Sequence, residues 1–206
     1  MDNSDDNGGG PAVWDDGASN VLLRAPSLNG AEDAVCTDLS TGPSAARENL
    51  LVLEYWSADS RIQETLAQPG PGPARMTLVS PASTTRSAAA TTDPVSATVT
   101  VEEVESGGDL ATIGTALTDA LRAWEATPEP TFVCIHSLTG MLQCVDVEAA
   151  FRFLHVLTSR VEATGARAHY HLDPNAHSEE TVETLSLLFD RVIDVAEDGS
   201  VTVRDD

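Results

Sequence analysis

Lysine is absent from this sequence, and the basic residues that it does contain are few. All 11 of them are arginine, against 33 acidic residues, and the formal net charge is −22. The arginines are scattered singly along the chain, whereas nucleic-acid binding draws on clustered basic side chains that neutralise phosphates. We therefore expect no direct binding to nucleic acid.

Long apolar runs are also missing. No run approaches the roughly 20 apolar residues that cross a bilayer. Residues 1–10 have neither the basic start nor the apolar stretch of a secretory signal. We expect a cytoplasmic protein that does not associate with a membrane.

Cysteine is scarce, with only Cys36, Cys134 and Cys144 in the chain. An odd count without a secretion signal does not indicate a disulfide framework. Cys134 stands in an apolar run, which predicts a small buried side chain.

The excess of carboxylates is the strongest global signal. Dense negative charge repels itself and destabilises a compact state at low salt. In molar salt the Debye length falls to about 3 Å, and most of this repulsion is screened. The composition is therefore typical of a protein from a salt-rich cytoplasm, and we expect a haloarchaeal source.

Strand-length apolar runs alternate with helical patterns along the chain. We expect strands at 20–24, 49–55, 75–79, 97–101, 131–136, 166–172, 191–195 and 200–203. Helices are expected at 31–39, 59–66, 109–124, 146–163 and 178–189. Such alternation predicts an α/β fold with a mostly parallel central sheet and helices on both of its faces.

The length of 206 residues suits one domain with a full core. We assign residues 1–18 to a disordered acidic tail and 19–206 to the domain. Residues 80–96, rich in Ser, Thr, Ala and Pro, are expected to form a flexible loop. Asp198-Gly199 is a hairpin turn signal, which predicts a C-terminal β-hairpin.

Residues 132–195 carry a resemblance to a known family. An apolar strand ending at His136 leads into a helix, a strand, a second helix and the run Leu188-Phe189-Asp190-Arg191-Val192. This order resembles the second half of RecA-like domains of the KaiC type, members of the P-loop ATPase superfamily. It looks most like a degenerate haloarchaeal member of unassigned function. The resemblance implies a RecA-like three-layer sandwich, and it implies domains that assemble side by side.

The phosphate-binding loop that the resemblance implies is degenerate. In an active member, a glycine-rich loop with a lysine follows the first strand and holds the phosphates. The corresponding residues here are Pro26, Ser27, Asn29 and Gly30, and they include one glycine and no lysine. Glu32 and Asp33 place carboxylates where phosphates would lie. Arg24 precedes the loop, a position unsuited to replacing the lysine, so nucleotide binding is doubtful.

The magnesium-binding position is also altered. The resemblance implies an aspartate after the apolar strand, but His136 and then Ser137 stand there. Neutral imidazole is a poor Mg²⁺ ligand, because this ion prefers oxygen. We therefore expect no conventional ATP hydrolysis. Ser137 also lacks the G-x-S-x-G turn of a hydrolase nucleophile.

Histidines gather where strands are expected to end. His169 and His171 alternate on one strand and so share a face, and Asp173 follows them. His136 ends a strand that should lie nearby, so two or three imidazoles and a carboxylate could meet in one crevice and bind Zn²⁺. The competing interpretation is that these histidines are buried or capping residues and hold no metal.

Three functions remain open from the sequence. The first is a non-catalytic regulatory or scaffold domain that binds a protein partner or itself, with no cofactor and no catalytic residue. The alternative is an atypical nucleotide-binding domain with little or no ATPase activity. The third is a metal-dependent enzyme that uses His136, His169 and His171.

Overall fold

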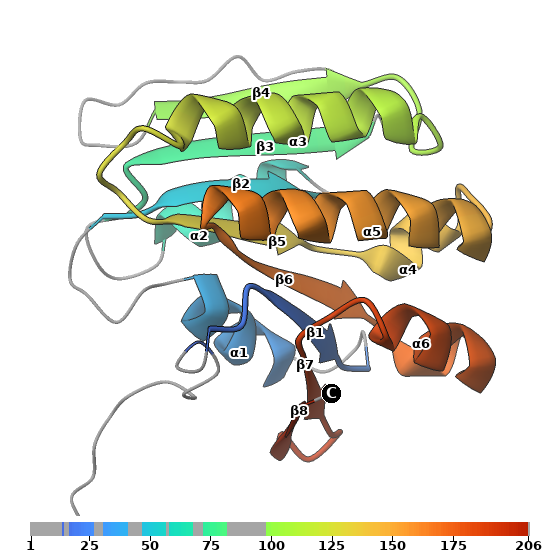
Figure 1. The fold of residues 1–206 in the computed structure, drawn as a ribbon. Coiled ribbons are helices and arrows are strands. Elements are labelled where there is room, and N and C mark those ends of the chain that lie inside the picture. The colour runs from blue at the N-terminus through green and yellow to red at the C-terminus, as the bar shows by residue number, and fades with distance from the viewer. Residues whose placement is uncertain are drawn as a thin grey trace, which may run out of the picture.

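One eight-stranded sheet forms the centre of the molecule. The computed structural model describes residues 14, 17–26, 31–40, 47–56, 58–67, 72–81 and 98–205. Within them the strand order is β4-β3-β2-β5-β6-β1-β7-β8, and only the β7–β8 pair is antiparallel (Figure 1). The strands are β1 (Asn20–Arg24), β2 (Asn49–Leu53), β3 (Arg75–Pro81), β4 (Thr98–Val104), β5 (Thr131–Ile135), β6 (Arg167–Leu172), β7 (Arg191–Val195) and β8 (Val201–Asp205).

Helices cover both faces of this sheet, so the molecule has three layers. Helices α1 (Ala31–Ser40) and α2 (Ala58–Ala67) pack on one face with one apolar cluster. Helices α3 (Leu110–Trp124), α5 (Val147–Thr164) and α6 (Glu179–Ser186) pack on the other face with a second cluster. The predicted α/β sandwich, its parallel sheet and its C-terminal hairpin are confirmed.

Capping side chains fix where the long helices begin. The side chains of Asp109, Asp146 and Ser178 accept hydrogen bonds from the first-turn amides of α3, α5 and α6. Gly165 ends α5 with φ at 69°, a left-handed conformation that glycine adopts without steric cost. Each of these ends follows from a local sequence signal.

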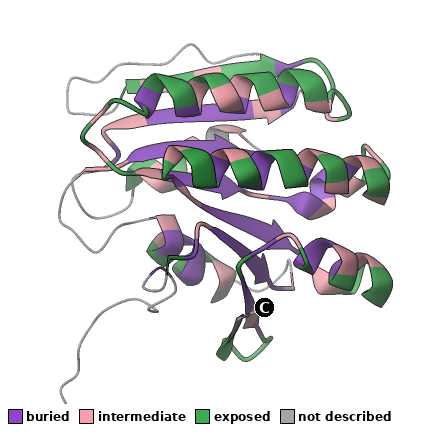
Figure 2. Ribbon diagram, in the orientation of Figure 1, coloured by how far each residue is buried: buried purple, intermediate pink, exposed green. Residues whose placement is uncertain are grey.

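The inner strands are buried on both sides, whereas the edge strands β4 and β8 are largely exposed (Figure 2). Successive residues of β5 illustrate the division between the two clusters. Val133 and Ile135 belong to the cluster under α3 and α5, whereas Phe132 and Cys134 belong to the cluster under α1. This alternation explains why the strands are almost continuously apolar in sequence.

Several boundaries differ from the sequence prediction. Ser80 and Pro81 belong to β3 and not to the loop expected at 80–96, whose remaining residues lie outside the described part of the chain. Trp14, inside the expected tail, is buried with its ring 6.4 Å from that of Phe132, because the indole gains by leaving water.

Two helices in the C-terminal half also differ from the sequence prediction. Helix α6 ends at Ser186 rather than near Phe189, because the amides of Leu188 and Phe189 bond three residues back in a tightened turn. A short helix that the sequence did not predict, α4 (Leu138–Leu142), follows β5.

No helix among the described residues is both long enough and apolar enough to cross a bilayer.

Candidate functional site

Polar side chains collect beneath α1 and α2, at and near the carboxyl ends of the inner strands. Parallel sheets place ligand sites at this end of their strands. The Cα of Cys134 in β5 pairs with that of His169 in β6, and His171 pairs with Leu23 in β1. Helix α1 lies over β5 and β6. We call the resulting group the strand-end cluster; its members are Glu32, Cys36, Glu54, Arg61, Cys134, His136, His169 and His171.

One half of the strand-end cluster joins Glu54, His136 and Arg61. Glu54 follows β2 and is buried, and its Oε2 lies 2.8 Å from Nδ1 of His136 and 3.4 Å from Nε of Arg61. Arg61 of α2 also donates to Nε2 of His136, which places the ring proton on Nδ1, facing Glu54. The Trp56 amide donates to Glu54 Oε1 at 2.8 Å. Glu54 and Arg61 are therefore partnered within the protein, and Nδ1 of His136 lies within ion-pair distance of Glu54 without the geometry of a hydrogen bond.

Electrostatics keep Glu54 charged although it is buried. Burial by itself would raise the pKa of this carboxyl group. The contact with His136, the hydrogen bond from the Trp56 amide and the charge of Arg61 together hold the pKa below its ordinary value. The carboxylate is thus committed to protein partners rather than open to a bound ion.

The other half brings two cysteines and two histidines together. Sγ of Cys36 lies 4.0 Å from Sγ of Cys134 and 3.4 Å from Nε2 of His169. Sγ of Cys134 lies 3.6 Å from Nε2 of His171. These four ligand atoms all lie within 4.8 Å of one another, and all four residues are buried. We call these four residues the Cys/His quartet.

The two histidines of the quartet differ in protonation. Burial lowers the pKa of His169 below its ordinary value. Burial would also lower the pKa of His171, but the attraction of Cys36 and the hydrogen bond between Nδ1 and Glu32 raise it to about 9. His171 therefore carries a proton that Glu32 accepts, and its ring lies between the halves, 4.9 Å from the ring of His136.

The cysteines also separate into two states. A hydrogen bond donated by the Cys134 thiol, together with the nearby histidines, holds the pKa of Cys36 well below its ordinary value despite burial. The same hydrogen bond and burial raise the pKa of Cys134. The quartet therefore favours a thiolate at Cys36, the form of cysteine that binds metals.

The predicted site residues are brought together only in part. His136, His169 and His171 do meet, as their spacing predicted, with ring centroids 4.9 and 5.1 Å apart. Asp173 instead caps the short helix Pro174–Ala176, accepting from the Asn175 amide at 2.9 Å. Ser137 caps α4.

The predicted phosphate loop falls largely outside the described residues. Ser27, Asn29 and Gly30 lie there, whereas Pro26 directly follows the end of β1 and is half-buried. Arg24 forms an ion pair with Asp194 at 2.7 Å, which turns its charge toward β7.

Sequence reasoning missed Glu32, Cys36, Glu54 and Arg61 as partners of the histidines. These residues lie 70 or more positions from His136, and only the crossover connections of the sheet bring them close. One local signal was present, because Glu32 and Cys36 are four residues apart and so share a face of α1.

Many solved structures share this fold, and two of them come from Pyrococcus horikoshii OT3. The protein PH0250 of Pyrococcus horikoshii OT3 is 9% identical, with a TM-score of 0.58, and the match covers 91% of this chain and 86% of that one. The KaiC-like protein PH0186 of the same organism is 11% identical, with a TM-score of 0.56, covering 96% of this chain and 86% of that one. At such identities the likeness concerns the fold alone, and it defines the class as a RecA-like α/β domain.

A more specific match comes from the sequence. A family model described as a family of unknown function (DUF7504) matches residues 18–195, which is most of the chain, and the protein belongs to that family. No curated protein matches this chain.

Proposed function

We propose that this protein is a non-catalytic RecA-like module that acts by binding a second copy of itself. The observation that carries the non-catalytic part is the commitment of Glu54 and His136 to each other and to Arg61. In an active relative of the resembled family, the position of His136 would hold a carboxylate for Mg²⁺. An imidazole with Arg61 beside one nitrogen and Glu54 beside the other offers no such ligand.

The residues around the degenerate phosphate-binding loop support the same conclusion. The chain has no lysine, and Arg24 is paired with Asp194. Glu32 lies in the first turn of α1 and bonds to His171. A carboxylate there occupies the positive end of the helix dipole, where a phosphate would otherwise bind.

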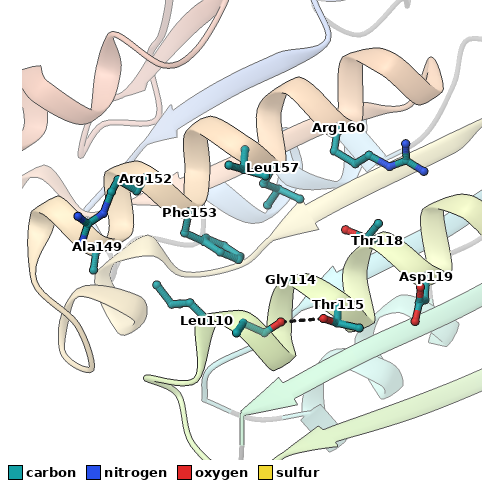
Figure 3. Close-up of a pocket in the computed structure, with 12 residues that line it drawn as sticks. Leu110, Gly114, Thr115, Thr118, Asp119, Ala149, Arg152, Phe153, Leu157 and Arg160 are labelled. Carbon is teal, nitrogen blue, oxygen red and sulfur yellow. Dashed lines mark hydrogen bonds between the residues drawn. The ribbon is translucent and has the colours of Figure 1, made fainter.

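A groove between α3 and α5 is our candidate for the self-association surface. Its volume is about 550 Å³, and Figure 3 shows Leu110, Phe153 and Leu157 directed toward the space between the two helices. Val156, 68% exposed, lies on its edge. An apolar surface of this kind on the outer helical layer is typical of a protein-binding site.

Charge complementarity favours a second copy as the occupant. Arg152 and Arg160 line this groove, although the chain has only 11 basic residues. Every copy has carboxylates in excess, so an acidic, partly apolar surface of another copy suits a groove that carries two arginines.

The test combines association with nucleotide binding in molar KCl. Light scattering should show concentration-dependent dimers or larger assemblies, and Val156→Glu should shift them toward monomer by placing a carboxylate in the groove. Leu187→Glu is the matched control, because Leu187 is 75% exposed on a different surface. A monomer at every concentration, or equal behaviour of the two variants, would contradict self-association through the groove.

Nucleotide binding is measured on the same preparation. ATP with Mg²⁺ should leave the melting temperature unchanged, because a ligand stabilises only a protein that binds it. A saturable rise in melting temperature would instead establish the atypical nucleotide-binding domain, and phosphate release would establish an enzyme.

We also place this module in the cytoplasm of a halophilic archaeon. The net charge of −22 and the absence of lysine support this assignment. The melting temperature should rise steadily from low to molar KCl as carboxylate repulsion is screened. A melting temperature independent of KCl would contradict the assignment to a halophilic archaeon.

A further inference from the structure

We infer that Cys36, Cys134, His169 and His171 bind one Zn²⁺ ion in a closed, structural site. The inference rests on the geometry of the quartet and does not depend on the proposed function. Two sulfurs and two imidazole nitrogens are a ligand set that Zn²⁺ favours, whereas Mg²⁺ and Ca²⁺ prefer oxygen.

The distances already approach those of a tetrahedron. With Zn–S near 2.3 Å and Zn–N near 2.0–2.1 Å, tetrahedral coordination puts two sulfurs about 3.8 Å apart and a sulfur and a nitrogen about 3.6 Å apart. Three of the six corresponding distances are 4.0 Å between the sulfurs, 3.4 Å from Cys36 to His169 and 3.6 Å from Cys134 to His171. All four ligand atoms lie within 4.8 Å of one another, so a contraction of the quartet about the ion would complete the site.

Burial and charge favour a structural ion over a catalytic one. Cys36, Cys134, His169 and His171 are 7, 2, 0 and 4% exposed. Four protein ligands leave no open coordination position for a water or substrate. Two thiolates balance the charge of Zn²⁺, so the complete site is neutral, as a buried site requires.

Glu32 supplies an outer-shell partner. Its Oε1 bonds to Nδ1 of His171, which leaves Nε2 of that ring directed toward the quartet. Metal-binding histidines commonly give their second nitrogen to a carboxylate in this way. Helix α1 would thus contribute a ligand, Cys36, and the carboxylate that orients another ligand.

His169 gives a further indication. This ring is fully buried, and its Nε2 lies 3.4 Å from the sulfur of Cys36, a weak hydrogen-bonding group. A metal bond at Nε2 would stabilise this buried imidazole far better than a thiol does.

A second group, Glu32, His136 and His171, also lies close enough to hold an ion. It is the weaker candidate, because His136 is engaged by Glu54 and Arg61 on both nitrogens. Glu32 is likewise engaged by His171. The sequence left open a metal-dependent enzyme that uses His136, His169 and His171. The site that we infer instead excludes His136.

The experiment measures metal in the full-length protein purified under reducing conditions. Elemental analysis should find about one Zn per chain, the stoichiometry of a single four-ligand site. After chelation, added Co²⁺ should give the absorption of a tetrahedral site with thiolate-to-metal charge transfer. These two measurements need no variant, so they stand even where a substitution prevents folding.

Substitutions then assign the ligands. Cys36→Ser, Cys134→Ser and His171→Asn should abolish the Co²⁺ thiolate band or reduce it strongly. Cys144→Ser and His155→Asn are the matched controls, because both residues are exposed, and they should retain one Zn per chain. Glu32→Gln should keep the thiolate band but weaken affinity by roughly 10–100-fold in a chelator competition.

Several results would overturn the inference. One is reduced wild-type protein that neither contains Zn nor develops a thiolate band with Co²⁺. Another is undiminished Zn in Cys36→Ser or Cys134→Ser, which would move the ion to other residues. A disulfide between Cys36 and Cys134 in protein purified under reducing conditions would also contradict it.

Discussion

The two faces of strands β5 and β6 are built from different chemistry, although they share one backbone. Toward α3, α5 and α6, the strands present Val133, Ile135 and Tyr170 to an apolar core. Toward α1, they present Cys134, His169 and His171, which contact one another and α1 rather than only apolar groups. Side chains alternate along a strand, so one stretch of sequence builds both environments.

The difference shows two ways of stabilising one sheet. The α5 face gains from burying apolar area, and its buried Tyr170 hydroxyl donates to Oδ1 of Asn20 at 2.9 Å. The α1 face depends on complete sets of partners, because an unpaired polar group is costly in a medium of low dielectric constant. Stability should therefore fall on the α5 face when buried side-chain volume is removed, and on the α1 face when a hydrogen-bond or ion-pair partner is removed.

The largest expected effect is on the apolar face. Leu154→Ala removes a fully buried side chain of α5 and should cost about 2–5 kcal/mol of unfolding free energy. His155→Ala, on the exposed side of the same helix and outside the groove, is the control and should change stability by less than about 0.5 kcal/mol. Denaturant titration in molar KCl measures both. Equal effects would mean that the α5 face is not a packed core.

A smaller but distinct effect is expected on the other face. Glu54→Gln keeps the size of the side chain but removes the charge that faces His136 and Arg61. Leaving these half-buried groups with a weaker acceptor should cost about 1–3 kcal/mol. The same denaturant titration tests it, with Glu64→Gln as control, because Glu64 is an exposed partner of the same Arg61. A neutral Glu54→Gln would break the comparison between the faces.

Acid provides a second measurement on Glu54. The pKa of this group is lower in the folded protein than its ordinary value, so near that value the unfolded chain binds more protons. Its contribution to stability is therefore present above the ordinary pKa of a glutamate and is lost as pH falls through the folded-state pKa. Glu54→Gln should remove that part of the acid dependence. An unchanged acid profile in the variant would show that the depressed pKa has no energetic consequence.

The fold was largely predictable because its signals are local. Apolar runs, the caps Asp109 and Ser178, and the Asp198-Gly199 turn each act within a few residues. The predicted end of α6 was wrong because its last turn tightens, and that of β3 was wrong because pairing with another strand decides it. Ser80 and Pro81 extend β3 because β4 pairs with them, and nothing in the sequence of β3 announces that neighbour.

The site was predictable only along single strands. The shared face of His169 and His171 follows from a period of two, and it was found. Cys36 and Glu54 come from separate crossover units, and their approach to these histidines depends on strand order, which no local pattern specifies. Cys134 was predicted as a buried apolar residue; it is buried, but its sulfur contacts His171 and Cys36.

The smallest expected effect concerns an ion pair on the surface, which we compare with the pair that Glu54 forms in the interior. Glu148 and Arg152 are 3.1 Å apart on α5 with both side chains mostly exposed. Glu148→Gln should therefore cost no more than about 0.5 kcal/mol at low salt, and nothing measurable in molar KCl, where exposed charges are screened. The cost of Glu54→Gln should persist across the same salt range, because buried pairs are screened much less. Denaturant titrations of both variants at low and high KCl separate the two cases. If the Glu54→Gln cost also vanished at high salt, the Glu54–Arg61–His136 group would behave as a solvated surface rather than as part of the protein interior.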